Sequence, residues 1–215
     1  MGTTMLRKLT LTTLLVASTQ VYAELKPGSV AIYSDGSVEK LVRIEDGWRL
    51  WESERKRLYS RSDLPVVPVL HYQKFPDRNQ GYRQRVINGQ PQLLLPFGEE
   101  ESMGFDVQRI SSSSGESVRR WDCKYVGKGS FTLRKKKLKT EKYECSRFAV
   151  KAKQADELKE TVRLKYSPSL GLVVDRRSTR ANGKKERVKL VRVLNPEKVT
   201  AKRIARTVYK LRTSK

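Results

Sequence analysis

Histidine and cysteine are scarce in this chain, which has one histidine, His71, and two cysteines among its 215 residues. A zinc site takes three or four His, Cys or carboxylate ligands at characteristic spacings, and His71 has no such pattern around it. The sequence also lacks the H-E-x-x-H, G-x-S-x-G, P-loop and calcium-loop motifs of common enzymes and metal-binding proteins. We therefore expect no catalytic residues, no metal and no other cofactor.

Long apolar runs are missing as well. No stretch approaches the roughly 20 apolar residues of a membrane-spanning helix, so we expect no transmembrane span. The one short run near the start, Leu9–Val16, follows two basic residues and precedes Val21-Tyr22-Ala23, a pattern typical of a cleavable signal peptide. We predict that residues 1–23 are a signal peptide and that the mature protein is periplasmic. The residue directly after Ala23 is Glu24 and not a cysteine, so a lipid anchor is not expected.

Acidic residues are half as frequent as basic ones, with 23 Asp and Glu against 46 Lys and Arg and a net charge of +23. Arg7 and Lys8 are the only charged residues of the predicted signal peptide, so the mature chain keeps +21. A charge of this size favours an anionic envelope surface or an acidic protein as the partner. Nucleic acid is a weaker candidate, because few aromatic residues lie among the basic ones to stack on bases. Alternatively, the charge serves only to solubilise the surface.

The basic residues that we expect to bind anions form three groups. One lies between the two cysteines, one flanks the Asn182-Gly183 turn, and one belongs to the C-terminal tail. The candidate residues are Arg134, Lys135, Lys136, Lys137, Arg176, Arg177, Arg180, Lys184, Lys185, Lys202, Arg203, Arg206 and Lys210.

The two cysteines, Cys123 and Cys145, are predicted to form a disulfide. An even cysteine count in an oxidising compartment favours a bridge over a metal site or a nucleophile. Both cysteines lie in alternating strand-like patterns, two residues after Trp121 and Tyr143, so antiparallel pairing of the two strands would bring the sulfurs together. Such a bridge would stabilise the fold by about 3 kcal/mol in the chain-entropy model. The alternatives are free thiols or a redox role, and no Cys-x-x-Cys motif is present to support a redox role.

Turn dipeptides divide the first half of the chain into short strands. Asp35-Gly36 and Asp46-Gly47 are hairpin signals between β-type runs. They predict a three-stranded meander over residues 28–62, with the third strand running through a charged stretch to Tyr59. Three prolines between residues 65 and 76 then predict an extended linker or edge segment. Residues 24–102 are therefore interpreted as an N-terminal β-rich region.

Six or more strands follow over residues 103–194, among them the segments 118–126 and 131–133. Consecutive strands with short turns predict a mainly β fold, an antiparallel half-barrel or sandwich. Residues 195–215 form a basic amphipathic tail, in which Asn195-Pro196-Glu197 predicts the start of a C-terminal helix. The apolar face of that helix would dock on the sheet, or its basic face would bind an anionic surface.

The order of motifs in the second region resembles a family of uncharacterised exported β-rich proteins of Gram-negative bacteria. The motifs are Trp121-Asp122-Cys123, a glycine turn over residues 127–129, Tyr143-Glu144-Cys145, Tyr166-Ser167-Pro168-Ser169-Leu170-Gly171 and the Asn182-Gly183 hairpin. The resemblance implies a domain of unknown function with a half-barrel similar to that of lipoprotein carriers, which is a likeness of architecture and not of site. The high charge and the basic tail depart from that family's pattern.

Three functions remain open from the sequence. The leading hypothesis is a non-catalytic periplasmic protein that binds an anionic envelope component or an acidic partner through its basic surface. The first alternative is a carrier whose curved sheet encloses a lipid or another apolar ligand. The second is an envelope hydrolase with a site assembled from scattered Asp, Glu, Ser or Tyr residues.

Overall fold

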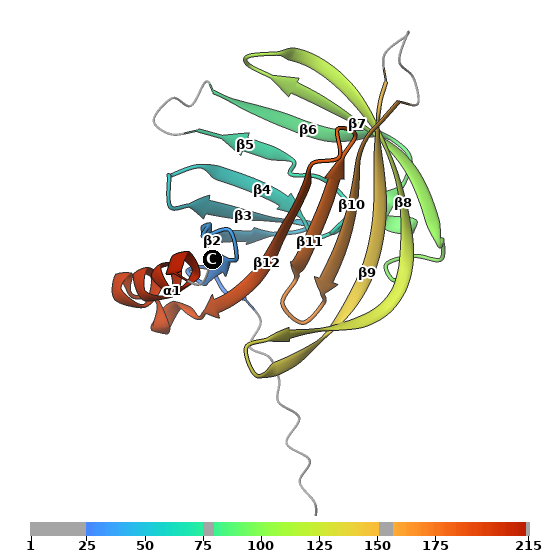
Figure 1. The fold of residues 1–215 in the computed structure, drawn as a ribbon. Helices are drawn as coiled ribbons and strands as arrows, with labels where there is room; N and C mark the ends of the chain where they lie inside the picture. Colours follow the sequence, from blue (N-terminus) through green and yellow to red (C-terminus); the bar gives the residue numbers. More distant parts are fainter. Residues whose placement is uncertain (1–24, 75–79, 151–156, 214–215) are drawn as a thin grey trace, which may run out of the picture.

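Antiparallel strands form a closed barrel in the computed structural model, which describes residues 25–74, 80–150 and 157–213 (Figure 1). The predicted signal peptide lies outside these residues. Each strand pairs with its neighbours in the sequence, and β1 also pairs with β12. The strands are β1 (Val30–Tyr33), β2 (Val38–Glu45), β3 (Trp48–Ser53), β4 (Leu58–Ser62), β5 (His71–Gln73), β6 (Gly81–Asn88), β7 (Ser102–Ser111), β8 (Gly115–Leu133), β9 (Lys136–Ala149), β10 (Glu157–Ser167), β11 (Leu172–Arg180) and β12 (Lys185–Leu194).

The expectation of a half-barrel or sandwich is wrong, because the sheet closes on itself. Val30 of β1 lies opposite Lys40 of β2 on one side and Leu194 of β12 on the other. Closure removes the open edges that a half-barrel would expose. The broader prediction of a mainly β fold with one C-terminal helix is confirmed. Strands from both regions that the sequence distinguished, 24–102 and 103–194, belong to this one sheet.

The predicted three-stranded meander has four strands in the structure. A turn after β3 interrupts the charged stretch that was expected to continue to Tyr59: the backbone amides of Ser53 and Lys56 donate to the carbonyls of Arg57 and Ser53 at 2.8 and 2.9 Å. Lys56 takes the left-handed conformation, with φ of 59°. A charged residue therefore occupies a position where glycine is the usual turn signal, which explains why the break was missed.

The long strand β8 replaces two predicted short strands. The expected glycine turn over residues 127–129 does not form. Instead, Gly127 has φ of 104° and lies at a shift of register in the β8–β9 pairing, so the strand continues through it as a bulge. Cys123 of β8 and Cys145 of β9 lie directly opposite each other and form the predicted disulfide.

Connecting segments fill part of the barrel interior. The proline-rich segment between β4 and β5, interpreted from sequence as an extended linker or edge, folds inward and places Val66 among the core side chains of β7–β10. The segment between β6 and β7, which includes the 3-10 turn η1 (Pro91–Leu93), contributes the fully buried Leu94 to the same cluster. Side chains of these two segments therefore occupy part of the space inside the barrel, and a cavity remains.

The C-terminal helix α1 (Ala201–Thr213) packs on the outside of the barrel beside β1 and β12. It begins later than predicted, because Asn195-Pro196-Glu197 leads into a separate 3-10 turn, η2 (Pro196–Lys198). Its apolar face, with Ile204 and Val208, covers Val30 and Ile32 of β1. No helix in the described part of the chain combines the length and the apolar character needed to cross a membrane.

Candidate functional site

The barrel encloses a cavity of about 520 Å³, within the size range of small-molecule sites. A row of aromatic side chains lies on successive strands at this side of the barrel: Trp51, Tyr59, Tyr72 and Tyr82. Its two end members, Trp51 and Tyr82, line the cavity. The rings of Tyr59 and Tyr72, and those of Tyr72 and Tyr82, are 5.3 Å apart between centroids. Aliphatic side chains, among them Val66, Val162, Leu164, Leu172 and Val188, form a further part of the lining.

Arginine is the main charged residue of this cavity. Six arginines line it against three carboxylates, those of Asp35, Glu39 and Glu160. The arginines are Arg49, Arg61, Arg109, Arg119, Arg147 and Arg176. The interior therefore carries an excess of positive charge in a place that is partly shielded from water.

Two of these arginines are neutralised by protein groups. The guanidinium of Arg61 donates to both carboxylate oxygens of Glu39, each at 2.7 Å, and burial together with Glu39 raises the pKa of the nearby Tyr33 phenol. Arg49 donates to the carbonyl of Gly171 at 2.7 Å and lies 3.1 Å from the Asp63 carboxylate. Both pairs tie β3 or β4 to other parts of the barrel and leave little charge for a ligand.

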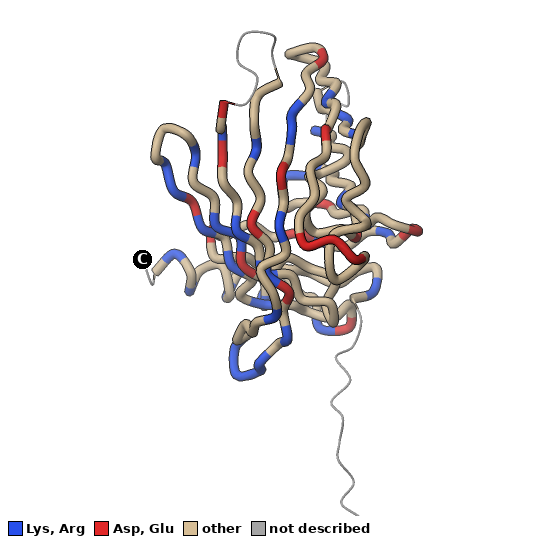
Figure 2. The backbone as a smooth tube through the Cα atoms, turned by 90° about the vertical axis from the view of Figure 1, so that its right-hand side faces the viewer, with Lys and Arg blue, Asp and Glu red and all other residues tan. Residues whose placement is uncertain are grey.

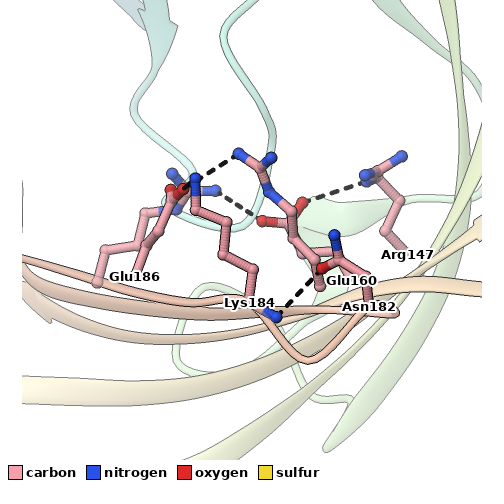
Figure 3. Close-up of polar contacts among 7 residues, drawn as sticks. Arg147, Glu160, Asn182, Lys184 and Glu186 are labelled. Carbon is pink, nitrogen blue, oxygen red and sulfur yellow. Dashed lines mark hydrogen bonds and ion pairs between the residues drawn. The ribbon is translucent and has the colours of Figure 1, made fainter.

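A second arginine group, which we call the inner arginine site, consists of Arg109 on β7, Arg119 on β8 and Arg147 on β9. Glu160 is the acidic residue of this group, and it is shared: Arg147 lies 3.3 Å and Arg176 3.4 Å from its carboxylate oxygens (Figure 3). Arg109 and Arg119 form no ion pair within the described residues. The inner arginine site therefore holds more positive charge than the protein neutralises.

Buried donors without acceptors mark the same place. The Nε of Arg109 and the indole Nε1 of Trp121 are both buried and have no hydrogen-bond acceptor among the described residues. The guanidinium of Arg109 lies over the ring of Tyr82 at 4.0 Å, and that of Arg147 lies 6.0 Å from the ring of Trp121. A buried donor left unpaired is unfavourable, and such a group in a native fold is often completed by a ligand or an ordered water.

Mutual repulsion at the inner arginine site acts on Arg119 most clearly. Burial of its guanidinium, together with the positive charges of Arg109 and Arg147, lowers the pKa of Arg119. The opposing attraction of Glu160 is the weakest influence. An anion placed between these three side chains would relieve the repulsion and accept several charge-assisted hydrogen bonds.

The residues predicted from sequence to bind anions lie in three separate places. Arg134, Lys135, Lys136 and Lys137 are at the β8–β9 turn, the lower hairpin in Figure 2, and Lys202, Arg203, Arg206 and Lys210 are on α1. Arg176, Arg177, Arg180, Lys184 and Lys185 are on β11, β12 and the turn between them, at the other end of the barrel.

Ion pairs offset part of the charge on β11 and β12. Arg180 lies 3.2 Å and Lys184 3.4 Å from the carboxylate of Glu186, while Arg177 lies 3.8 Å from that of Asp175 (Figure 3 shows the Glu186 pairs). Arg176 points into the cavity rather than outward. The basic group on β11 and β12 is therefore partly neutralised by neighbouring carboxylates.

The inner arginine site was missed in the sequence because its charges are far apart along the chain. A signal was nevertheless present. Arg109 follows Phe105 and Val107 in alternation, and Arg147 follows Tyr143 and Cys145 in the same way. A charged residue in phase with the inward apolar face of a strand is an interior residue, since successive side chains point to opposite faces.

No metal site is visible within the described residues, where no three His, Cys, Asp or Glu side chains gather. The guanidinium groups and aromatic rings that line the cavity are groups that can bind an anion with an apolar or aromatic part.

Comparison with known proteins supports the fold. No family model matches the sequence, and no curated protein matches it. The crystal structure of the hypothetical lipoprotein YmcC from Escherichia coli (K12) is similar, with a TM-score of 0.51, 11% identity, and coverage of 76% of this chain and 82% of that chain. A putative lipoprotein from Parabacteroides distasonis has a TM-score of 0.38 at 10% identity, covering 80% of this chain and 97% of that chain. The chain thus shares a β-barrel fold with a bacterial lipoprotein whose name states no function.

Proposed function

We propose that this protein is a non-catalytic binding protein of the bacterial envelope that holds an amphiphilic anion inside its barrel. The observation that carries the proposal is the inner arginine site: Arg109 and Arg119 line the cavity without a carboxylate of their own. The predicted signal peptide over residues 1–23 and the fold likeness to a bacterial lipoprotein support the envelope as its location.

The apolar lining indicates what the rest of the ligand is like. Val162, Leu164 and the ring of Tyr166 lie along the same cavity wall as Glu160, in alternation on β10. A ligand whose charged group meets the inner arginine site would therefore extend its apolar part along β10 and the aromatic row of β3–β6. The proposal combines two hypotheses from the sequence. The ligand is enclosed in the barrel, as the carrier hypothesis expects, and it is anionic, as the hypothesis of a basic binding surface expects.

A matched pair of fluorescent probes tests the proposal. One is 8-anilinonaphthalene-1-sulfonate, and the other is N-phenyl-1-naphthylamine, which has the same rings without the sulfonate. The wild-type protein should bind the sulfonate at least about tenfold more tightly, because charge-assisted hydrogen bonds contribute about 1.5–3 kcal/mol. The double variant Arg109→Gln/Arg119→Gln should lose that preference and bind both probes alike.

A control variant distinguishes the effect of the inner arginine site from the effect of the protein's net charge. Lys128→Gln/Lys139→Gln removes two exposed cations from β8 and β9 and should leave both affinities unchanged. Equal binding of the two probes by the wild type would overturn the proposal. Retention of the sulfonate preference by Arg109→Gln/Arg119→Gln would overturn it too.

A further inference from the structure

The β8–β9 turn, the end of β12 and α1 lie at the same end of the barrel (Figure 1), and arginines on them form a second group. This group, the outer arginine site, consists of Arg134 in the β8–β9 turn, Arg192 on β12, and Arg203 and Arg206 on α1. Arg134 is far from the other three in the sequence, and its charge acts on Arg192 together with the charges of Arg203 and Arg206. None of the four arginines has an ion-pair partner in the described part of the chain.

Arg192 is held in place beneath the helix. One of its terminal nitrogens donates to the hydroxyl of Thr207 at 3.0 Å, and this hydroxyl donates to the carbonyl of Arg203 at 2.9 Å. Thr207 is buried, and the neighbouring Ile204 and Val208 pack α1 against the barrel. The position of Arg192 relative to α1 is therefore fixed by packing and hydrogen bonds.

The four positive charges influence one another. Burial of Arg192, followed by the charges of Arg134, Arg203 and Arg206, lowers the pKa of the Arg192 guanidinium, and no carboxylate opposes that effect. The Nε of Arg192 is also buried without an acceptor among the described residues. Such an arrangement is unfavourable by itself and becomes favourable when an anion lies between the side chains.

The backbone at Arg134 gives an independent indication. Leu133 pairs with Lys136, so Arg134 and Lys135 form a two-residue turn, and Arg134 has φ of 58°. Left-handed positions of this kind favour Gly, Asn or Asp, and a long side chain there carries some strain. The turn itself therefore does not account for an arginine, and the charge of Arg134 acts on Arg192.

We propose that the outer arginine site binds a phosphoryl group. Each guanidinium is a planar fork of donors that matches phosphate oxygens, and several of them together suit the charge of a phosphoryl group better than that of a single carboxylate. The site is separate from the inner arginine site and does not depend on it. The same chemistry is offered by a phospholipid headgroup and by a soluble phosphate compound.

Titration of the full-length protein with inorganic phosphate at low ionic strength, with chloride at matched ionic strength as reference, tests the site. The test variant Arg134→Asn/Arg206→Gln removes two charges and replaces the strained turn residue with one suited to it. The control Lys184→Gln/Lys185→Gln removes two charges at the other end of the barrel. Phosphate affinity should fall at least about fivefold in the first variant and stay within twofold in the second.

Vesicles identify the source of the phosphoryl group. Sedimentation with vesicles of phosphatidylglycerol and phosphatidylcholine, compared with phosphatidylcholine alone, should show binding that the test variant loses and the control keeps if the source is a lipid headgroup. Phosphate binding without vesicle binding would indicate a soluble phosphate compound. The proposal would be overturned if the wild type bound neither phosphate nor vesicles, or if the test and control variants lost binding equally. Binding of the naphthalene sulfonate should be unchanged in all of these proteins, which separates this result from the interior site.

Discussion

Asp175 on β11 is a buried carboxylate whose charge depends on one arginine. It accepts hydrogen bonds from Nε and a terminal nitrogen of Arg187 at 2.9 and 2.6 Å, and its side chain is 4% exposed. Burial alone would raise the pKa of Asp175, but the hydrogen bonds and charge of Arg187, with the charges of Arg177 and Lys189, lower it below the ordinary range of an aspartate.

Replacing Asp175 should therefore destabilise the barrel in a pH-dependent way. Asp175→Asn should lower the free energy of unfolding by about 1.5–3 kcal/mol at pH 7. A carboxyl group with a lowered pKa contributes stability above its unfolded pKa and loses it as the pH falls through the folded value. The free energies of unfolding of Asp175→Asn and wild type, measured with urea, should therefore differ less at pH 2.5 than at pH 7. An equal loss at both pH values would show that the ionised carboxylate is not the cause.

Arg61 and Arg119 should respond in opposite ways to the same substitution. Arg61→Met leaves the buried Glu39 without its cationic partner and should cost about 3–5 kcal/mol of stability. Arg119→Met relieves repulsion from Arg109 and Arg147 and should raise the stability of the ligand-free protein by about 0.5–2 kcal/mol. Chemical unfolding of the two variants measures both. If Arg119→Met destabilises as much as Arg61→Met, Arg119 has a structural role instead of a ligand-binding one.

At the scale of single residues, the sequence predicted the disulfide and the basic clusters but not the interior charges. Cys123 and Cys145 could be paired because each stood in a local alternating pattern. Arg109, Arg119 and Arg147 could not be brought together, because that requires the register of β7 to β9. Register depends on pairings between distant residues and on bulges, such as the one at Gly127, that the sequence does not mark clearly.

Among the elements, the β8–β9 hairpin should depend most on its disulfide. The bridge joins residues separated by 22 positions, so its removal should lower the free energy of unfolding by about 3 kcal/mol. The pairing of β8 with β9 runs from Arg119 and Ala149 to the Arg134 turn, so the reduced protein should remain folded at pH 7. Urea unfolding of the oxidised and reduced wild-type protein, with Cys123→Ala/Cys145→Ala as a second reference, measures the difference. A loss below about 1 kcal/mol would contradict the estimate.

Element types were easier to predict than element boundaries. The Asp-Gly dipeptides correctly predicted the first hairpins, and the amphipathic pattern of the tail correctly predicted α1. The break after β3 and the continuous β8 were missed, since Lys56 makes a turn where glycine is usual and Gly127 makes none where a turn was expected. The late start of α1 has a similar cause, because Asn195 and Pro196 begin a 3-10 turn before Thr200 accepts a hydrogen bond from the Arg203 amide.

For the whole molecule, closure of the barrel is what creates an interior. The closing contact joins β1 near the start of the described chain to β12 near its end, and this long-range pairing has no local sequence signal. In the closed barrel, basic residues from different strands come together at two places, the inner and the outer arginine site. We therefore expect binding to be governed by these two sites and only weakly by the overall charge.

The most direct test of the interior site uses the three tryptophan indoles as reporters. Trp51 and Trp121 line the cavity, whereas Trp48 does not. In ¹⁵N-labelled protein, assigned with a Trp121→Phe variant, addition of 8-anilinonaphthalene-1-sulfonate should shift the Trp121 indole signal most, because its Nε1 has no acceptor among the described residues. The Trp48 signal should stay in place. Shifts confined to Trp48, or a Trp121 signal unchanged at saturating probe, would contradict ligand binding inside the barrel.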